Sequence, residues 1–376
     1  MRIAIAVERE PESRVAATPD TVKKMTALGA AVAVEPGAGV KSGVRDADYA
    51  EAGAVVTREA VAEADIVLRV QRPNEAELAR CKKGALVIAI MDPYGNEAAL
   101  AAMARAGVSA FAMELMPRIT RAQAMDVLSS QANLAGYRAV IDAATEYGRV
   151  LPMMMTAAGT VPAARVFVMG AGVAGLQAIA TARRLGAIVT ATDVRPAAKE
   201  QVASLGAKFI AVEDEEFKNA QTAGGYAKEM SKEYQAGQAA LIAEDIKKQD
   251  IVITTALIPG RPAPRLISAA MVGAMRPGSV IVDLAIERGG NVEGAVAGAV
   301  TEVDGVKIVG HLNVAGRLAA SASSLYAKNL LAFVELLIDK KTKTLAVDWN
   351  DEIVKATALT RDGAVIHPSF APKSAA

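Results

Sequence analysis

A glycine-rich segment between a strand-like run and a helical run carries the clearest chemical signal in the sequence. Gly170, Gly172 and Gly175 have the spacing G-x-G-x-x-G, after the apolar run 165–169 and before the helical run 176–185. In this context the first glycine permits a tight turn, the second lets the backbone approach a pyrophosphate, and the third allows close packing of helix on strand. The first N–H groups of the helix would then face the phosphates. The segment predicts a dinucleotide-binding turn, and a glycine turn that holds no ligand is the alternative.

Two charged residues at the end of the next strand-like run indicate which dinucleotide to expect. Asp193 can accept hydrogen bonds from the hydroxyls of the adenosine ribose, and its charge would repel a 2′-phosphate. Arg195 argues in the other direction, because a nearby arginine can accept a 2′-phosphate. We expect NAD(H) rather than NADP(H).

A polar constellation, Arg118, Gln123 and Asp126, lies where the first α/β run ends and a long helix, expected at 126–147, begins. This is a natural position for a cleft between two domains. In a functional interpretation, the three side chains face a carboxamide. In a structural interpretation, Asp126 is the N-cap of the helix and Arg118 is a surface ion-pair partner.

Two further segments also have both a functional and a structural interpretation. The polar insert 213–237 contains Gly224, Gly225 and Tyr226, which suggest a hinged lid, but a solvated loop has the same composition. The segment 254–260 follows a strand at its carboxyl end, where doubly wound folds bind ligands, although a Pro/Gly loop is ordinary there.

The composition excludes several classes of function. Two histidines and one cysteine, Cys81, cannot form a closed structural zinc site, and a single cysteine permits no internal disulfide. The 42 Lys and Arg residues against 41 Asp and Glu residues leave no basic excess for nucleic acid. We therefore expect neither a metal site nor a nucleic-acid partner. His311 has a general acid–base and a structural interpretation, whereas His367 is expected to be structural.

The same features predict a cytoplasmic protein. The N-terminus shows no basic leader followed by a long apolar stretch and a cleavage site. The longest apolar runs are far shorter than the roughly 20 residues that span a bilayer. Docking onto a membrane complex is compatible with these observations.

The elements that would position these residues form an α/β pattern, in which short β-branched runs alternate with helical segments. Helices are expected at 19–28, 126–147 and 320–337. Strands are expected at 2–7, 31–35, 65–70, 85–91 and 108–113, and then at 165–169, 187–192, 208–212, 251–257, 280–286 and 307–309.

These elements predict two Rossmann-like, doubly wound parallel-sheet domains linked by the two long helices. Residues 1–130 plus 320–376 would form one domain, and residues 131–319 would form the NAD(H)-binding domain. The tail 344–367 is expected to be a hairpin with Arg361-Asp362-Gly363 as its turn.

Several unusual strings make the chain resemble a known family over essentially its whole length. It is similar to the NAD(H)-binding component, the first portion of the alpha subunit, of proton-translocating nicotinamide nucleotide transhydrogenases. The strings are Arg69-Val-Gln71-Arg72-Pro73, Met113-Glu-Leu-Met-Pro117-Arg118-Ile119, Ser129-Ser130-Gln131, Asn133-Leu-Ala-Gly136-Tyr137-Arg138-Ala139, Met155-Thr-Ala-Ala-Gly159, Gly225-Tyr226-Ala227-Lys228 and Thr254-Thr-Ala-Leu-Ile-Pro-Gly260.

The resemblance implies a set of functional residues. Arg118, Gln123 and Asp126 would hold the nicotinamide end of NAD(H), with Ser129 as a neighbouring contact. Gly225 and Tyr226 would belong to a mobile loop that closes over the nucleotide. The implied catalytic residues are Arg118, Gln123, Asp126 and Tyr226, and the other implied NAD(H)-binding positions are Gly170, Gly172, Val173, Ala174, Gly175, Asp193, Val194, Arg195, Gln238 and Leu257.

The resemblance also implies an activity and partners. Hydride would pass directly between NADH bound here and NADP⁺ bound on a separate beta subunit, while membrane-spanning subunits translocate protons. The chain would be a homodimer, peripheral on the cytoplasmic face of the inner membrane through its partners. Such a transfer needs orientation and a dry cleft but no general acid, which agrees with the scarcity of His and Cys.

Two other functions remain as alternatives. Alanine dehydrogenases share the pattern Arg14-Val-Ala-Ala-Thr-Pro19, which would make Arg14 the anchor of a substrate carboxylate. Those enzymes use a histidine and a lysine around their substrate, and the corresponding residues here are Ile90 and Gln71, which cannot exchange a proton. An NAD-sensing module that binds a protein partner without turnover is the third hypothesis.

Overall fold

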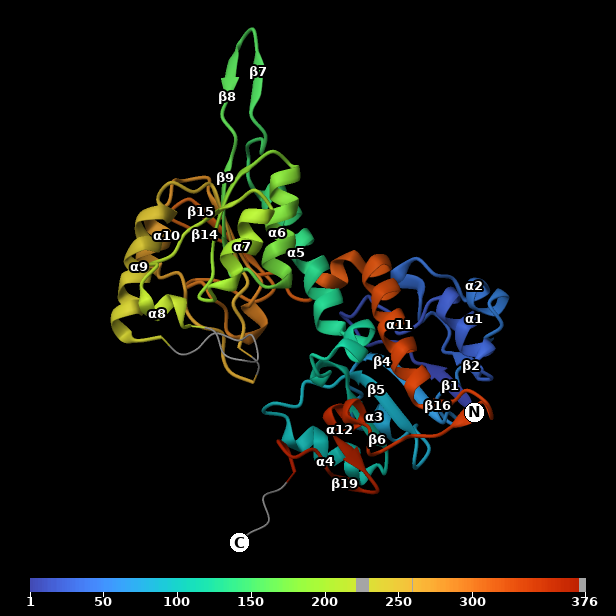
Figure 1. Cartoon of the computed structure of the whole chain (residues 1–376). Coiled ribbons are helices and arrows are strands. Elements are labelled where there is room, and N and C mark those ends of the chain that lie inside the picture. Colours follow the sequence, from blue (N-terminus) through green and yellow to red (C-terminus); the bar gives the residue numbers. More distant parts are fainter. Residues whose placement is uncertain (221–229, 259, 372–376) are drawn as a thin grey trace. The chain divides into compact units, whose positions relative to one another are not determined.

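The chain folds into two compact units, seen in Figure 1. The computed structural model describes residues 1–220, 230–258 and 260–371. One unit comprises residues 1–131 and 316–376, and the other comprises residues 132–315. The long helix α5 (Val127–Glu146) begins in the first unit and continues in the second. Among the described residues, no helix combines the length and apolar character needed to cross a bilayer.

The first unit is built on a six-stranded parallel sheet with the order β3-β2-β1-β4-β5-β6. The strands are β1 (Arg2–Ile5), β2 (Ala31–Val34), β3 (Val55–Val56), β4 (Ile66–Gln71), β5 (Leu86–Ile90) and β6 (Ser109–Ala112). The chain reverses its direction of travel across the sheet between β1 and β4. The carboxyl ends of these two strands flank the position where doubly wound sheets bind ligands.

Helices cover both faces of this sheet, because successive strand residues point to opposite sides. Ile3 and Ile5 pack with α1 (Pro19–Ala27) and α11 (Ala319–Leu336), whereas Ala4 packs with α4 (Glu97–Arg105). The remaining helices of this unit are α2 (Asp46–Glu51), α3 (Glu75–Leu78) and α12 (Glu352–Thr357).

The second unit contains a seven-stranded sheet with the order β11-β10-β9-β12-β13-β15-β14, parallel except for β14. Its strands are β9 (Arg165–Met169), β10 (Ile188–Thr192), β11 (Lys208–Phe209), β12 (Ile251–Thr254), β13 (Val280–Asp283), β14 (Val300–Val303) and β15 (Val306–Val309). Its helices after α5 are α6 (Val173–Arg184), α7 (Ala197–Ser204), α8 (Glu215–Lys218), α9 (Lys232–Ile246) and α10 (Ala269–Gly273).

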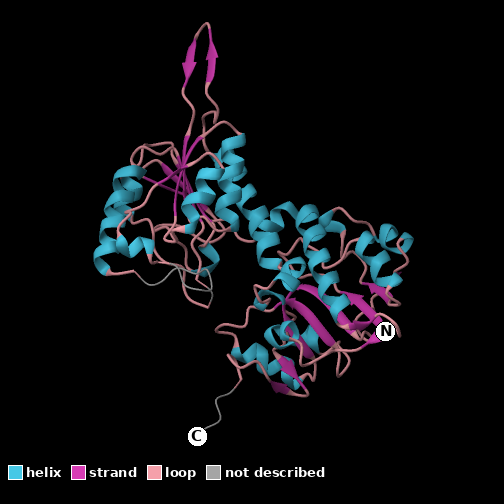
Figure 2. Cartoon of the chain, in the orientation of Figure 1, coloured by secondary structure: helices cyan, strands magenta, loops and turns pink. Residues whose placement is uncertain are grey.

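The predicted α/β fold with parallel sheets is confirmed. Figure 2 shows helices on both sides of the strands in each unit, and the core residues agree with it. In β9, Val166 and Val168 pack with α5 and α6, whereas Phe167 and Met169 pack with α9 and α10. Strands that are buried on both faces have continuous apolar sequences, which is why the sequence predicted them.

Three parts of the chain differ from the prediction. The tail is a hairpin only at β18 (Thr360–Arg361) and β19 (Ala364–Val365), and it contains helix α12 where strand was expected. Asp351 caps α12 by accepting hydrogen bonds from the backbone of Ile353 and Val354, whose side chains are buried in the first core. The strand expected at 208–212 is reduced to β11.

An antiparallel hairpin, β7 (Met154–Thr156) and β8 (Gly159–Val161), was not predicted. Every residue of both strands is exposed, and Figure 2 shows the hairpin extending away from the sheet of its own unit. It forms no buried face, so no alternation of apolar and polar residues announces it in the sequence.

Helices α5 and α6 touch through their backbones. A Cβ atom on Gly136 of α5 would lie 2.0 Å from the carbonyl oxygen of Ala174 in the first turn of α6. Asn133 Nδ2 donates to Gln177 Oε1 across the same contact at 3.1 Å. The small residue at 136 therefore sets the distance of α5 from the helix that opens the glycine-rich turn.

Candidate functional site

The glycine-rich turn joins β9 to α6, as predicted, and each glycine has a separate physical role. Gly170 has a φ of +101°, which favours glycine. A Cβ on Gly175 would lie 1.8 Å from the carbonyl oxygen of Gly170, so the helix can pack here only if Gly175 has no side chain. A Cβ on Gly172 would meet no atom within 4 Å. The second glycine is thus not needed for packing and leaves open space beside the turn.

The first turn of α6 borders this open space, because Gly172 is the N-cap of the helix and Val173 and Ala174 follow it. By helix geometry, the first N–H groups lack intrahelical acceptors, and they carry the positive end of the helix dipole. This arrangement suits an anionic phosphate.

Asp193 is fixed beside the turn by four hydrogen bonds. Its Oδ2 accepts from the Ala171 backbone N–H at 2.7 Å and from Arg195 Nη2 at 2.8 Å. Its Oδ1 accepts from the backbone N–H and Nε of Arg195, at 2.8 and 2.9 Å. The hydrogen bond with Asp193 raises the pKa of Arg195. The guanidinium is therefore held by the carboxylate, as a bidentate pair.

Three other predicted residues lie around the same ends of the strands. Val194 and Leu257 are 39% and 51% exposed, and they follow β10 and β12, the two neighbours of β9. Gln238 of α9 is buried, accepts from the backbone N–H of Val212 and donates to Thr192 Oγ1, both at 2.9 Å. The second unit thus brings the glycine-rich turn together with Asp193, Val194, Arg195, Gln238 and Leu257.

The segment that contains Arg118, Gln123 and Asp126 lies in the first unit, between β6 and α5. Asp126 accepts from the Ser129 backbone N–H at 2.9 Å and from Ser129 Oγ at 2.5 Å, which confirms its interpretation as the N-cap of α5. Arg118 and Gln123 are exposed. The role of these residues in holding a nicotinamide stays a prediction, as does a cleft between the domains.

The turn that presents Gln123, a 3-10 helix over Thr120–Met125, is anchored on both sides of that residue. Arg121 forms ion pairs with Asp351 and Glu352 at 2.6 and 3.3 Å. Asn329 Nδ2 of α11 donates to the carbonyl oxygen of Ala124 at 2.8 Å. Gln123 therefore projects from a fixed backbone, and Arg121 is occupied by α12.

The predicted lid residues Gly225 and Tyr226 lie outside the described residues. The described ends of the insert 213–237 do not form a solvated loop, and this part of the prediction is wrong. Phe217 of α8, Met230 and Tyr234 of α9 form a small buried cluster, and Ser231 Oγ donates to Glu216 Oε2 at 2.5 Å. The two ends of the insert are joined to each other by apolar contact and a charged hydrogen bond.

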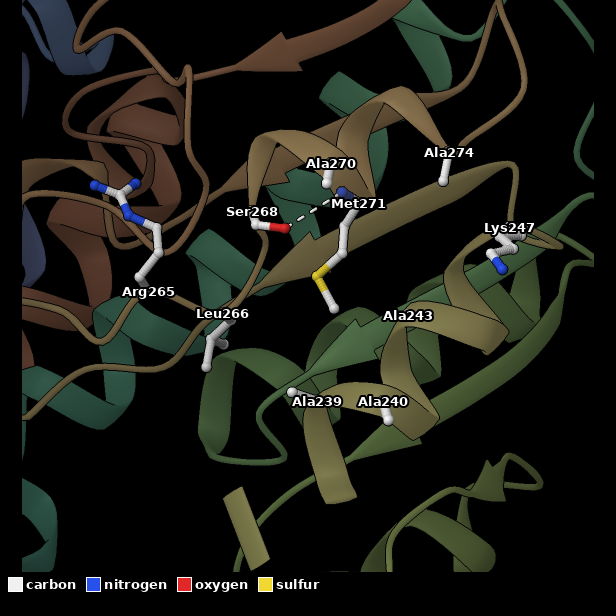
Figure 3. Close-up of a pocket in the computed structure, with 10 residues that line it drawn as sticks. All are labelled: Ala239, Ala240, Ala243, Lys247, Arg265, Leu266, Ser268, Ala270, Met271 and Ala274. Carbon is white, nitrogen blue, oxygen red and sulfur yellow. Dashed lines mark hydrogen bonds between the residues drawn. The ribbon is translucent and has the colours of Figure 1, made fainter. Parts of the chain in front are cut away.

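A groove elsewhere on the second unit lies between α9 and α10 and has a volume of about 500 Å³ (Figure 3). Alanines from both helices and Met271 form most of its wall, with Lys247 and Arg265 at its ends. None of the residues predicted to bind NAD(H) lines it, so it is not the predicted site.

Glu114 was missed by the sequence analysis. It follows β6, and its Oε1 accepts from the backbone N–H groups of Met91 and Asp92, the first at 2.8 Å. Its Oε2 is buried without a hydrogen-bond partner among the described residues. Burial raises the pKa of Glu114 to about 7. The available signal was a single carboxylate within the apolar run 108–116.

Comparison with known proteins identifies the family. Residues 4–135 match the N-terminal domain model of alanine dehydrogenase/PNT, and residues 139–368 match its C-terminal domain model. The chain belongs to the alanine dehydrogenase/PNT family.

Individual members of the family differ in their similarity to this chain. It is 55% identical to the first portion of the NAD(P) transhydrogenase subunit alpha of Rhodospirillum rubrum, a separate polypeptide there, over 100% of both chains. A crystal structure of transhydrogenase from Sinorhizobium meliloti is 65% identical, with a TM-score of 0.90, and the match covers 97% of this chain and 100% of that one. Alanine dehydrogenase of Mycobacterium tuberculosis is 33% identical over 78% of this chain and 75% of its own length.

One residue that this chain shares with the alanine dehydrogenases, Arg14, is buried and fully engaged. Its Nε and Nη2 donate to Glu12 at 2.9 and 2.8 Å, and its Nη1 donates to Gln131 Oε1 at 2.8 Å. Gln71 Nε2 donates to Glu12 Oε2 at 3.0 Å. In this member of the family, the guanidinium that would anchor a substrate carboxylate binds the protein's own carboxylate.

The raised pKa of Glu114 predicts a pH-dependent stability. A carboxyl whose pKa is higher in the folded state stabilises the fold below its unfolded pKa of about 4.5, and this contribution is lost as pH rises through about 7. Glu114→Gln should remove the effect. Between about pH 4 and about pH 8, the free energy of unfolding of the native protein should fall relative to that of the variant by about 2–3 kcal/mol.

Urea unfolding at several pH values would measure this difference. Glu63→Gln, which changes an exposed carboxylate of the same unit, is the matched control and should follow the native protein. A constant difference between the native protein and Glu114→Gln across this pH range would contradict the prediction.

Proposed function

We propose that this chain is the NAD(H)-binding component of a proton-translocating transhydrogenase. In this proposal, hydride passes directly between NADH bound here and NADP⁺ bound on a separate beta subunit. The observation that carries the proposal is the open side of Gly172 at the start of α6, in a chain that matches the Rhodospirillum rubrum transhydrogenase polypeptide over its full length.

The residues of the glycine-rich turn fit a dinucleotide. A side chain on Gly172 would fill the open space that a pyrophosphate needs, whereas Gly170 and Gly175 are required by the turn itself. The backbone N–H groups at the start of α6, with Val173 and Ala174, would hold the phosphates, and Asp193 would accept from the ribose. Leu257 and Val194 would contact the nucleotide through their exposed side chains, while Gln238 supports Thr192 and Val212.

The pairing of Asp193 with Arg195 supports NAD(H) rather than NADP(H). To bind a 2′-phosphate, Arg195 would have to give up two charge-assisted hydrogen bonds to Asp193, and the freed carboxylate would then repel the phosphate. NADP(H) is accordingly assigned to the partner subunit.

The polar residues of the first unit supply orientation in this proposal. When bound, NADH supplies the hydride, so the protein itself has no proton to move. Gln123, on a backbone anchored through Arg121 and Ala124, would bind the carboxamide together with Arg118, and Tyr226 would help to exclude water. Asp126 and Ser129 bind each other and so fix the end of α5 from which they would contact the nicotinamide side.

An alanine dehydrogenase-like activity is the alternative, suggested by the similarity to the Mycobacterium tuberculosis enzyme. The engagement of Arg14 by Glu12 and Gln131 argues against it, because a substrate carboxylate would have to displace a buried ion pair. Gln71 and Ile90 also lack a group that can exchange a proton.

We also propose that the chain is a homodimer that joins its membrane-spanning partners at the cytoplasmic face of the inner membrane. The β7–β8 hairpin supports the dimer, because Met153, Met155 and Val161 are 62%, 73% and 45% exposed. An isolated two-stranded ribbon is only marginally stable in water. A second copy of the chain would cover these apolar side chains.

The hydride-transfer proposal is tested by mixing the chain with the NADP(H)-binding beta subunit. NADH and an NADP⁺ analogue with a distinct absorbance should exchange hydride only when both proteins are present. Oxidation of NADH by pyruvate and ammonia without any partner would instead support the alternative. Binding of both nucleotides without transfer would overturn the proposal.

The orienting role of Gln123 predicts a separation of rate from affinity. Gln123→Asn shortens the side chain by one methylene and should slow hydride transfer by about tenfold to a hundredfold, because misplacement of the ring is costly. The dissociation constant for NADH should change by less than about threefold. Gln201→Asn, an exposed glutamine of α7, is the control and should change neither. Equal losses of rate and affinity would contradict the role.

The glycine-rich turn predicts opposite effects for two alanine substitutions. Gly172→Ala should preserve the melting temperature, since the backbone (φ −75°, ψ −167°) suits alanine, but should weaken NADH binding by about tenfold or more. Gly175→Ala should lower the free energy of unfolding by at least about 2 kcal/mol through its collision with Gly170. Fluorescence titration and urea unfolding distinguish the two. Unchanged NADH affinity in Gly172→Ala would contradict the phosphate role of the turn.

The hairpin predicts the effect of one charge on assembly. Met155→Asp would place a carboxylate in an apolar interface and should convert the dimer to a monomer at micromolar concentration in sedimentation experiments. Val40→Asp, at an apolar residue of the first unit that is 62% exposed, should leave the dimer intact. A native protein that sediments as a monomer would disprove the dimer.

A further inference from the structure

One buried asparagine holds the segment that follows β12. Asn291 is fully buried, and its side chain pairs with the backbone of Ala256 on both sides. The Ala256 N–H donates to Asn291 Oδ1 at 3.1 Å, and Asn291 Nδ2 donates to the Ala256 carbonyl at 2.9 Å. The amide thereby replaces a neighbouring strand at the point where the chain leaves the sheet.

The same residue holds the other end of this segment. Asn291 Nδ2 also donates to the carbonyl oxygen of Pro264 at 2.8 Å. The backbone carbonyl of Asn291 accepts from the N–H groups of Leu266 and Ile267, at 2.8 and 3.0 Å. One residue therefore closes the segment where it leaves β12 and where it returns.

Asp283, the last residue of β13, fixes Asn291 in turn. Its Oδ2 accepts from the backbone N–H groups of Asn291 and Val292, at 2.8 and 3.0 Å. Its Oδ1 accepts from the Ala285 N–H at 2.9 Å and from Thr254 Oγ1 at 3.2 Å. Four donors on one buried carboxylate make this a satisfied network, which specifies a single backbone arrangement.

The network ends at the glycine-rich turn. Thr255, next to Ala256, donates from Oγ1 to the carbonyl oxygens of Met169 and Gly170, at 3.3 and 3.1 Å. A Cβ on Gly170 would lie 2.5 Å from the same hydroxyl oxygen. A continuous chain of contacts thus runs from Asp283 through Asn291, Ala256 and Thr255 to Gly170.

We propose that Asn291 and Asp283 are positioning residues of the NAD(H) site. They act through the backbone of Thr255 and Ala256, set the place of Gly170 and of Leu257, and do not touch the nucleotide. The inference rests on the proposed function, because the affinity it concerns is that for NAD(H). Its physical basis is that the turn binds phosphate through backbone groups, whose positions no side-chain rotamer can correct.

Asn291→Ala tests the proposal. It leaves the N–H and carbonyl of Ala256 and the carbonyl of Pro264 without their partner, so the segment can shift away from Gly170. The dissociation constant for NADH, measured by fluorescence titration of the full chain well below its melting temperature, should rise by about tenfold or more. Affinity per folded molecule is independent of global stability as long as the chain stays folded.

Val306→Ala is the matched control. Val306 is fully buried in the same unit, at the first residue of β15, and its truncation lowers stability without reaching the carboxyl ends of the strands. Its affinity for NADH should equal that of the native protein. A loss of affinity in Val306→Ala as large as that in Asn291→Ala would reduce the role of Asn291 to stability and would overturn the proposal.

Thr255→Val provides a second variant if Asn291→Ala does not fold. It keeps the shape of the side chain and removes only the hydroxyl that bonds to Met169 and Gly170, and it should also weaken NADH binding several-fold. Native affinity in every folded variant, beside a native protein that binds NADH, would overturn the positioning role alone. A native protein that does not bind NADH would overturn the proposed function as well.

Discussion

The packing of α6 against two backbones is the constraint on which the second unit depends. On one side, Gly175 lies so close to the Gly170 carbonyl that any Cβ would collide with it, and on the other, Gly136 of α5 touches Ala174. These contacts set the position of the first turn of α6, and with it the N–H groups that would bind phosphate. The turn, the helix and the second half of α5 are therefore one rigid assembly.

Buried polar groups in both units satisfy one another. In the first unit, Glu12 receives hydrogen bonds from Arg14 and Gln71, and in the second, Asp283 receives four. Charges used in this way stabilise the scaffold and are not available to a substrate. The residues of the first unit that we propose to face the nicotinamide, such as the exposed Gln123, are orienting groups, which suits a hydride transfer that moves no proton.

The success and failure of sequence-based prediction follow from burial. Strands such as β9 and β12 were predicted because both of their faces are covered, so their apolar runs are continuous. Helix α12 was missed, because its cap, Asp351, and its buried residues, Ile353 and Val354, depend on contacts with a core built from distant residues. The β7–β8 hairpin has no buried face and gave no periodic signal.

The sequence by itself determined the turn chemistry, because a glycine that must have no Cβ is written in its identity, and it determined the family through strings that extend over the whole chain. Only the tertiary structure revealed which polar residues are occupied. Asp126 by Ser129, Arg195 by Asp193 and Arg14 by Glu12 are short-range pairs that the sequence also permits to be open. Asn291 became visible as a support of the turn only when β12 and β13 were placed side by side, because hydrogen bonds between distant residues leave no periodicity in the sequence.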